Sequence, residues 1–308
     1  MKFAGRMNSF IFKGKYDLFS TIEKYRSMDD VTHLEFNYPE HFEGHKIERI
    51  REAIGDMKVN GVATRFKAPF VAGEFTNTDE TVRAEAIKLC KEAVDACRAI
   101  GGSVVTIWQA YDGYDYPFQI DYEKAWGQMI EAFREIADYG KDLKISIEYK
   151  PFEPRNYTML DGIGTVLLAI KEIGRENVGV TLDFCHMLMK HDNPSYSMVL
   201  AAKEHRLFGL HLNDGYCAMD SGLIFGSVNL PQSIELVYYL KKYQYDGVVF
   251  FDSFPVREGA EEEVAANIKT FQKIWNLIDT VGMEKVEEVI SRNDGVASQQ
   301  FLIDILAS

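Results

Sequence analysis

The feature of this sequence that most restricts its fold is an alternation of short β-rich runs with longer segments of helical period, repeated about eight times. Most of the runs are apolar and rich in β-branched residues, as Val104–Ile107 is, which is typical of strands buried on both faces. Strands that alternate with helices form parallel sheets with crossover connections. The predicted strands are Lys2–Met7, Thr32–Asn37, Gly61–Phe66, Ser103–Trp108, Lys144–Lys150, Gly179–Cys185, Leu207–Asn213 and Gly247–Ser253.

Apolar residues recur every three or four positions in the segments between these runs, which indicates amphipathic helices. The segment Asp79–Ile100, for example, begins with acidic residues and stops at Gly101, as a capped helix does. The predicted helices are Asp79–Ile100, Asp121–Tyr139, Leu160–Ile173, Tyr196–Glu204, Leu230–Lys242, Ala260–Asp279, Met283–Arg292 and Ser298–Ala307.

Eight strand–helix units over about 250 residues match the size of a closed (β/α)8 TIM barrel. An open doubly wound α/β sheet is the competing fold, but it would carry a Gly-rich phosphate loop after its first strand, and Met7–Phe12 contains no glycine. No Pro-, Gly- or Ser-rich linker divides the chain. We therefore expect a single α/β (β/α)8 barrel over residues 1–280 and a C-terminal helical extension over residues 281–308.

The charge of the chain argues against several classes of partner. Its 34 basic and 47 acidic residues give a net charge of −13, which repels nucleic acids and anionic lipids. The opening Met1–Arg6 lacks a signal-peptide pattern, and no stretch approaches the length of a membrane span. The four cysteines form no C-x-x-C pair. These features predict a cytoplasmic protein with reduced thiols and no nucleic-acid or membrane partner.

Polar residues end four consecutive apolar strands, where a barrel builds its active site. Three carboxylates gathered there beside one imidazole would disfavour one another's ionised forms unless a divalent cation joined them. Oxygen ligands with one imidazole suit manganese, which we expect, or magnesium, cobalt or zinc. The alternative is separate ion pairs, such as one between Asp252 and Arg257 or between Glu148 and Lys150. The predicted metal ligands are Glu148, Asp183, His211 and Asp252.

Two further residues are candidates for the chemistry itself, together with Glu148. Lys150 follows Glu148 by two positions on the same strand face, where it would hydrogen-bond a substrate oxygen or transfer a proton. An ion pair that only holds Glu148 is the other interpretation of Lys150. His186 follows Asp183 by three residues and would contact substrate or a second cation, with a surface histidine as the alternative.

An aromatic loop, Trp108–Phe118, follows the fourth predicted strand. Aromatic faces stack on the C–H faces of sugars, so this loop would cover a ligand at the rim of the barrel. Basic residues near strand ends are candidates for a phosphate contact or for ion pairs; these are Arg65, Lys67 and Arg257. The predicted substrate-binding residues are Trp108, Tyr111, Asn213 and Phe254.

Three of these stretches, Glu148–Pro154, Leu182–His186 and His211–Asp214, resemble the xylose-isomerase-like barrel superfamily of sugar isomerases and epimerases. Glu-Tyr-Lys-Pro-Phe-Glu-Pro is most similar to the L-rhamnose isomerase motif. The resemblance implies a metal-ligand role for the four residues above. It also implies that Lys150 is the active-site lysine and that His186 lies near a second metal.

The sequence departs from these relatives at two points. Rhamnose isomerase-like enzymes hold their second metal with several aspartates, whereas Met219–Gly222 keeps one, Asp220. Ketose 3-epimerases use a glutamate where this chain has Asp252. A third branch that the chain resembles is the large, metal-binding subunit of C-glycoside deglycosidases, lyases that act on 3-oxo-glycosides with a small β-rich partner subunit.

All three branches share proton transfer next to a sugar carbonyl through an enediolate-like intermediate, with a divalent cation that polarises the carbonyl. The sequence therefore predicts a metal-dependent sugar isomerase or epimerase, with the C-glycoside lyase as the alternative and a non-catalytic sugar-binding barrel as a further one. The expected ligand is a carbohydrate or glycoside, and the expected assembly is a homo-oligomer or a hetero-oligomer with a small subunit. AP-endonuclease relatives of this barrel need more histidines and a basic face, and the net charge of −13 argues against that class.

Overall fold

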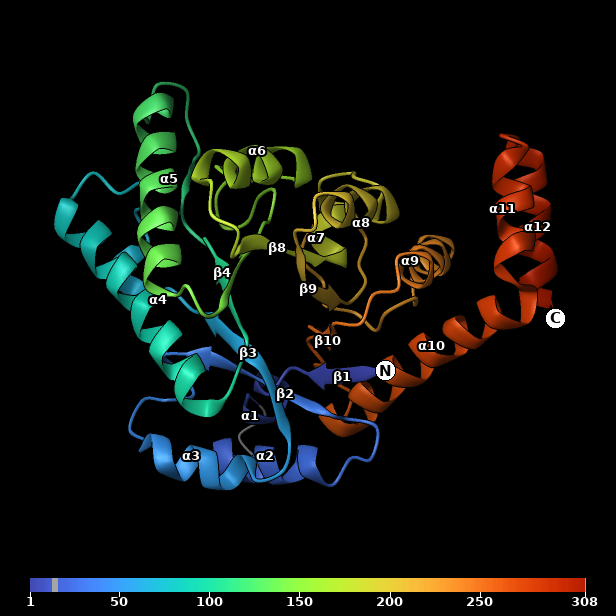
Figure 1. The fold of residues 1–308 in the computed structure, drawn as a ribbon, viewed down its shortest axis with the longest axis horizontal. Coiled ribbons are helices and arrows are strands. Elements are labelled where there is room, and N and C mark those ends of the chain that lie inside the picture. Colours follow the sequence, from blue (N-terminus) through green and yellow to red (C-terminus); the bar gives the residue numbers. More distant parts are fainter. Residues whose placement is uncertain (13–15, 308) are drawn as a thin grey trace.

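The computed structural model describes residues 1–12 and 16–307, and its centre is one eight-stranded sheet curved into a nearly closed barrel (Figure 1). The strands run parallel in the order β1-β10-β9-β8-β6-β4-β3-β2. The backbone N–H of Thr32, just before β2, donates to the carbonyl of Phe3 in β1 over 3.0 Å and links the two ends of the sheet. The strands are β1 (Lys2–Gly5), β2 (His33–Tyr38), β3 (Lys58–Thr64), β4 (Val104–Trp108), β6 (Lys144–Glu148), β8 (Val178–Asp183), β9 (Leu207–Leu212) and β10 (Val248–Phe251).

Helices surround the sheet, and the last two lie at the far end of α10, at the edge of the molecule (Figure 1). Among the described residues, none of the helices is both long enough and apolar enough to cross a membrane. A separate two-stranded antiparallel ribbon consists of β5 (Gly113–Tyr114) and β7 (Tyr157–Thr158). The helices are α1 (Asn8–Ile11), α2 (Leu18–Arg26), α3 (Ile47–Ile54), the 3-10 turn η1 (Ala68–Phe70), α4 (Glu80–Ile100), α5 (Tyr122–Tyr139), α6 (Ile163–Ile173), α7 (Phe184–Met189), α8 (Pro194–Lys203), α9 (Leu230–Lys242), α10 (Ala260–Val281), α11 (Met283–Ser291) and α12 (Gly295–Ala307).

The predicted α/β barrel is confirmed, with strand ends displaced by up to three residues. The eight predicted helices are also present, and α4 shows why they were recognisable. Asp79 caps it by accepting from the N–H of Thr81 over 2.8 Å, and Gly101 ends it in the left-handed conformation. The division into a barrel over residues 1–280 and an extension over residues 281–308 stays a prediction.

Strand register brings the polar strand ends into one row. Asp183 pairs with His211, and His211 pairs with Phe250, which lies two residues before Asp252 and therefore on the same face. Below this row the interior is tightly packed: at Gly209, for example, a Cβ would lie 2.3 Å from the Thr181 hydroxyl, and Phe250 is buried two residues before Asp252. The barrel is therefore filled beneath the site, and the polar row lies at its carboxyl-terminal mouth.

Candidate metal centre

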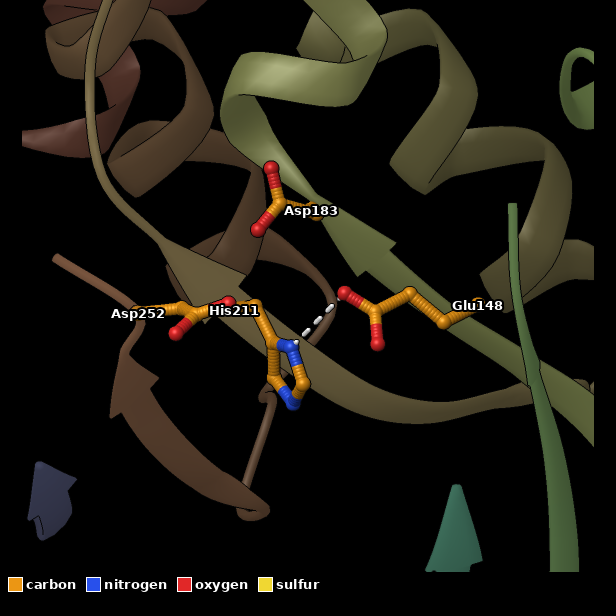
Figure 2. A group of neighbouring side chains, drawn as sticks. All are labelled: Glu148, Asp183, His211 and Asp252. Carbon is orange, nitrogen blue, oxygen red and sulfur yellow. Dashed lines mark hydrogen bonds and ion pairs between the residues drawn. The ribbon is translucent and has the colours of Figure 1, made fainter. Parts of the chain in front are cut away.

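Four buried side chains from four neighbouring strands converge at the mouth of the barrel (Figure 2). One ligand atom from each lies within 4.8 Å of the others. Glu148 and Asp183 are the last residues of β6 and β8, His211 lies in β9, and Asp252 directly follows β10. These are the four residues that the sequence predicts as metal ligands.

The cluster has the chemistry and the size of a divalent-cation site. Nitrogen and oxygen ligands lie about 2.0–2.2 Å from such an ion, so ligands on opposite sides are up to about 4.4 Å apart. The present spread of 4.8 Å needs only a small contraction. The Oδ1 atom of Asp252 is buried and accepts no hydrogen bond, as expected for an oxygen available to a cation. The four clustered residues therefore fit a divalent cation.

The protonation of the cluster is uneven because its members have different neighbours. Burial opposes ionisation of Glu148, but the imidazole of His211 outweighs it and lowers the pKa of Glu148 to about 2. Burial raises the pKa of Asp183 to about 7, and the nearby carboxylates add to this effect. Burial also raises the pKa of Asp252, although Arg6 opposes the change. A cation would have to displace protons to bind here.

Glu35 is a buried residue of this site that the sequence analysis missed. Its Oε1 lies 3.4 Å from Nε2 of His211, and its Oε2 accepts a hydrogen bond from Nδ2 of Asn60 over 2.6 Å. On its other side His211 places Nδ1 3.1 Å from Oε1 of Glu148. Glu35 thus faces the outer ring nitrogen and leaves Nδ1 toward the cluster. The only sequence signal was an acidic residue inside the apolar run Leu34–Phe36.

Asn213, predicted to contact substrate, is fully buried behind the metal ligands instead. Its Nδ2 donates to Oδ2 of Asp183 over 3.0 Å and to the carbonyl of Asp252 over 3.1 Å, and its Oδ1 accepts from the N–H of Cys185. The side chain therefore orients two carboxylate-bearing strands. Its position is consistent with support of the cluster rather than with contact to a sugar.

Lys150, His186 and Asp220 form a second polar group beside the ligands. The Asp220 Oδ2 atom lies 3.2 Å from both Nζ of Lys150 and Nε2 of His186, and Lys150 also lies 2.8 Å from Glu153. Burial opposes the charge of Lys150, yet Asp220 and Glu153 outweigh it and raise its pKa. Burial likewise opposes the charge of His186, but Asp183 and Asp220 raise its pKa to about 9. The alternative interpretation, an ion pair of Lys150 with Glu148, is not what the structure shows, because Lys150 pairs with Asp220 and Glu153.

A cavity of about 360 Å³ opens above the ligands. Trp108 and Phe254, both predicted to bind substrate, lie in its wall, but Tyr111 and Asn213 do not line it. Tyr111 instead packs against the hydrophobic core, and its N–H donates to Oε1 of Glu74 over 2.9 Å. The wall consists of Arg6, Arg65, Trp108, Glu148, Lys150, Glu153, Pro154, His186, Asp220, Asp252 and Phe254.

The aromatic loop Trp108–Phe118 is anchored at its centre and exposed beyond it. Buried Asp112 accepts hydrogen bonds from the N–H groups of Glu74 and Phe75 over 2.8 and 3.0 Å. Beyond this anchor Tyr116 is 71% exposed and Phe118 is fully exposed. The base of the loop is therefore held at the cavity through Trp108, whereas its tip leaves aromatic surface free at the rim.

Comparison with known proteins identifies similar sequences and folds. The family profile described as xylose isomerase-like TIM barrel matches residues 19–284. A xylose isomerase from Thermus thermophilus is 30% identical over 230 residues, which are 71% of this chain and 59% of the relative. The chain thus spans about three fifths of the length of that curated relative.

Solved structures show the same fold at low sequence identity. A D-tagatose 3-epimerase-like protein superposes with a TM-score of 0.72 and 21% identity, over 92% of this chain and 100% of its own. The IOLI protein, solved with a zinc atom, superposes with a TM-score of 0.68 and 18% identity, over 90% and 98% of the two chains. At these identities the likeness establishes the fold, and the chemistry has to be argued from the site.

Proposed function

Because this chain belongs to the family of xylose isomerase-like TIM barrels, we propose that it is a divalent-metal-dependent sugar isomerase or epimerase. The observation that carries the proposal is the convergence of four metal-binding side chains within 4.8 Å, beneath a cavity that also contains Lys150 and His186. The similarity to a xylose isomerase and to a D-tagatose 3-epimerase-like protein supports the same class of reaction. The individual sugar does not follow from those names.

Glu148, Asp183, His211 and Asp252 would hold the cation. We expect manganese, with magnesium, cobalt and zinc as alternatives, and the zinc atom in the IOLI protein supports a site of this kind. When bound, the cation polarises a sugar carbonyl and its neighbouring hydroxyl, which makes the adjacent C–H more acidic.

The side chains above the ligands supply orientation and proton transfer. Lys150 is held in its charged form by Asp220 and Glu153, so we assign it as a hydrogen-bond donor to a substrate oxygen rather than as a base. We assign proton transfer to His186, whose Nδ1 is buried without a hydrogen-bond partner. Its pKa is raised in part by Asp183, a proposed ligand whose charge a bound cation would offset, so its ring would lose a proton more readily than Lys150. Asp220 orients the ring through Nε2, 3.2 Å away. Trp108 and Phe254 offer aromatic faces for the C–H groups of a sugar.

The exposed aromatic residues at the rim favour a second candidate function. Tyr116 and Phe118, on the loop that follows β4, are 71% and fully exposed, and Tyr157 in β7 is 57% exposed. A surface of this kind suits an aromatic aglycone or a small partner subunit, as expected for a C-glycoside lyase that acts on 3-oxo-glycosides. Both functions begin with removal of a proton beside a carbonyl, so the same site serves either.

The test is turnover in deuterium oxide with manganese, using free ketoses, aldoses and 3-oxo-glycosides as substrates. We expect solvent deuterium in the product, because the transferred proton exchanges with His186 and solvent. Glu148→Gln should lose bound metal and reduce turnover at least about 100-fold. The matched control is Glu52→Gln, which changes an exposed glutamate on α3 and should leave both unchanged.

Three outcomes would contradict the proposal in different ways. Turnover without deuterium uptake would indicate hydride shift in place of proton transfer. Release of an aglycone from 3-oxo-glycosides would assign the lyase function. Binding of sugar with no turnover by metal-loaded protein, unchanged by Glu148→Gln, would indicate a non-catalytic sugar-binding barrel.

A further inference from the structure

Two arginines line the cavity from strands that carry none of the four predicted ligands, and one of them, Arg6, reaches Asp252. Arg6 directly follows β1 and Arg65 directly follows β3, whereas the ligands come from β6, β8, β9 and β10. Neither arginine has a place in the proposed proton transfer. The chain as a whole has a net charge of −13, so two guanidinium groups in one cavity are a local feature and do not reflect a basic surface.

The charges of these arginines are poorly matched by the protein, unlike that of Lys150. Within the described parts of the chain, Arg65 forms no ion pair; its guanidinium lies 5.7 Å from the ring centre of Trp108. Arg6 has one carboxylate contact, 3.2 Å from its Nε to Oδ1 of Asp252, and that Nε makes no proper hydrogen bond. Because Asp252 is also a predicted metal ligand, cation binding would take part of this carboxylate's charge away from Arg6.

An aromatic ring of the cavity wall lies beside each of the two guanidinium groups. The Arg6 guanidinium lies 4.6 Å from the ring centre of Phe254, and the Arg65 guanidinium lies 5.7 Å from that of Trp108. Both rings belong to the cavity wall. Stacking against a ring leaves the in-plane N–H donors of a guanidinium free. Five such donors in a rigid fork match the paired oxygens of a carboxylate or a phosphate, and a desolvated charge needs an opposite charge rather than a neutral hydroxyl.

We propose that Arg6 and Arg65 form an oxyanion subsite, so that the substrate is a sugar bearing a carboxylate or a phosphate group. This inference rests on the proposed function for the identity of the sugar ring, but the subsite itself depends only on the two arginines. The ring would lie between this group and the metal ligands, with the reacting carbonyl on the acidic side of the cavity. A neutral sugar would leave Arg65 without an opposite charge and Arg6 with Asp252 alone, whose charge a bound cation would share.

The test is calorimetric binding to the manganese-loaded protein with three probes: D-glucuronate, D-fructose 6-phosphate and neutral D-fructose. We expect at least one of the two anionic probes to bind at least about tenfold more tightly than D-fructose, as one charge-assisted hydrogen-bond pair provides. Arg65→Met should remove about tenfold of that affinity and change D-fructose binding by less than about twofold. Whichever anion responds identifies the group as carboxylate or phosphate.

Lys67→Met is the matched control, because Lys67 is an exposed cation two residues from Arg65 that does not line the cavity. It should leave all three affinities unchanged. Arg65→Lys keeps the charge without the fork and should recover part of the lost affinity. It also keeps the test valid if Arg65→Met folds poorly.

Equal affinity for all three probes, or an equal loss for D-fructose in Arg65→Met, would overturn the inference. Its failure can be told apart from failure of the proposed function. Deuterium uptake into neutral ketoses alone would retain the enzyme and overturn the oxyanion subsite. Arg65-dependent anion binding without turnover of any sugar would retain the subsite and remove the isomerase or epimerase assignment.

Discussion

The two halves of the barrel mouth have the same backbone geometry and opposite chemistry. On one side, parallel strands end in Glu148, Asp183 and His211, with Asp252 directly after β10. On the other, equivalent positions after β1 and β3 carry Arg6 and Arg65. The barrel therefore determines only where these side chains lie, and their residue types determine whether that part of the mouth suits a cation or an anion.

Asp252 belongs to both halves. It is one of the four clustered side chains, and its Oδ1 also lies 3.2 Å from Nε of Arg6. In the absence of a cation the arginine compensates part of its charge, which opposes the rise in the pKa of Asp252 that burial causes. We therefore expect a cation and an anion to favour each other's binding. A cation on Asp252 would leave the charge of Arg6 less compensated, and an anion on Arg6 would leave the charge of Asp252 less compensated.

The largest effect should come from replacing a ligand in the acidic half. Asp183→Asn keeps the shape of the side chain, and its carbonyl oxygen can still accept from the N–H of His186, which caps α7. It removes a charged oxygen from the cluster, so manganese affinity should fall by more than about 100-fold, beyond the effect of losing an outer-shell contact. Competition with a chelator and metal analysis of the dialysed protein measure this loss.

The matched change in the cationic half is Arg65→Met, which should leave manganese affinity within about threefold, because an outer-shell effect of tenfold is not expected from a residue that contacts no ligand. Equal losses in the two variants would mean that the mouth is one coupled network. Full metal retention in Asp183→Asn would mean that this carboxylate does not bind the cation.

A smaller effect should follow from Glu35→Ala, which removes the carboxylate 3.4 Å from Nε2 of His211. Without it the ring loses the contact that leaves Nδ1 toward the cluster, so manganese affinity should fall by about 10- to 100-fold. Glu35 is also one of the carboxylates that raise the pKa of His211, so NMR titration of the ring without metal should show a lower pKa than in the wild type.

The conservative variant Glu35→Gln provides the control for this prediction. Its amide oxygen can still accept a hydrogen bond from the N–H at Nε2 of His211, so most of the manganese affinity should return, whereas a merely structural defect would affect both variants alike. Unchanged metal affinity in Glu35→Ala would show that His211 needs no second contact to hold its ring.

The sequence was informative about the acidic half because its residues interrupt apolar strands at their ends. Glu148 ends Ile145–Ile147, and Asp183 ends Val180–Leu182, so both stand out as charges where only a site can use them. Arg65 was recognised only as one of three basic candidates. Its distinction from exposed Lys67 and Arg257 depends on the direction of the chain after β3, which periodicity does not contain.

Contacts between distant segments account for what the sequence could not predict. Glu35 reaches His211 across the barrel, and Asp220 reaches Lys150 from the loop after β9, so neither pairing has a local signal. The sequence predicts Asn213 at the end of its strand but gives no sign that it is buried below the cavity. Its burial depends on its partners Asp183 and Asp252, which come from the two neighbouring strands. The strands themselves were predictable because burial on both faces leaves continuous apolar runs.

The smallest expected effect concerns Glu263, a buried carboxylate of α10 that contacts Asn267. Burial raises its pKa to about 7, against the hydrogen bonds of Ser253 and Asn267 that lower it. A raised pKa in the folded state means that folding favours the protonated acid. This contribution is complete below the ordinary pKa of 4.5 and is lost as the pH rises toward 7.

Glu263→Gln is neutral at every pH and should abolish this loss. Relative to the wild type, the free energy of unfolding of the variant should rise between pH 4.5 and pH 8 by up to about 3 kcal/mol, the value of a shift of this size. Urea unfolding at several pH values measures the difference, and exposed Glu52→Gln should show a constant one. If the difference in the free energy of unfolding were constant for Glu263→Gln as well, the carboxylate of Glu263 would be ionised in the folded protein. Arg6 would then compensate the charge of Glu263 in addition to that of Asp252.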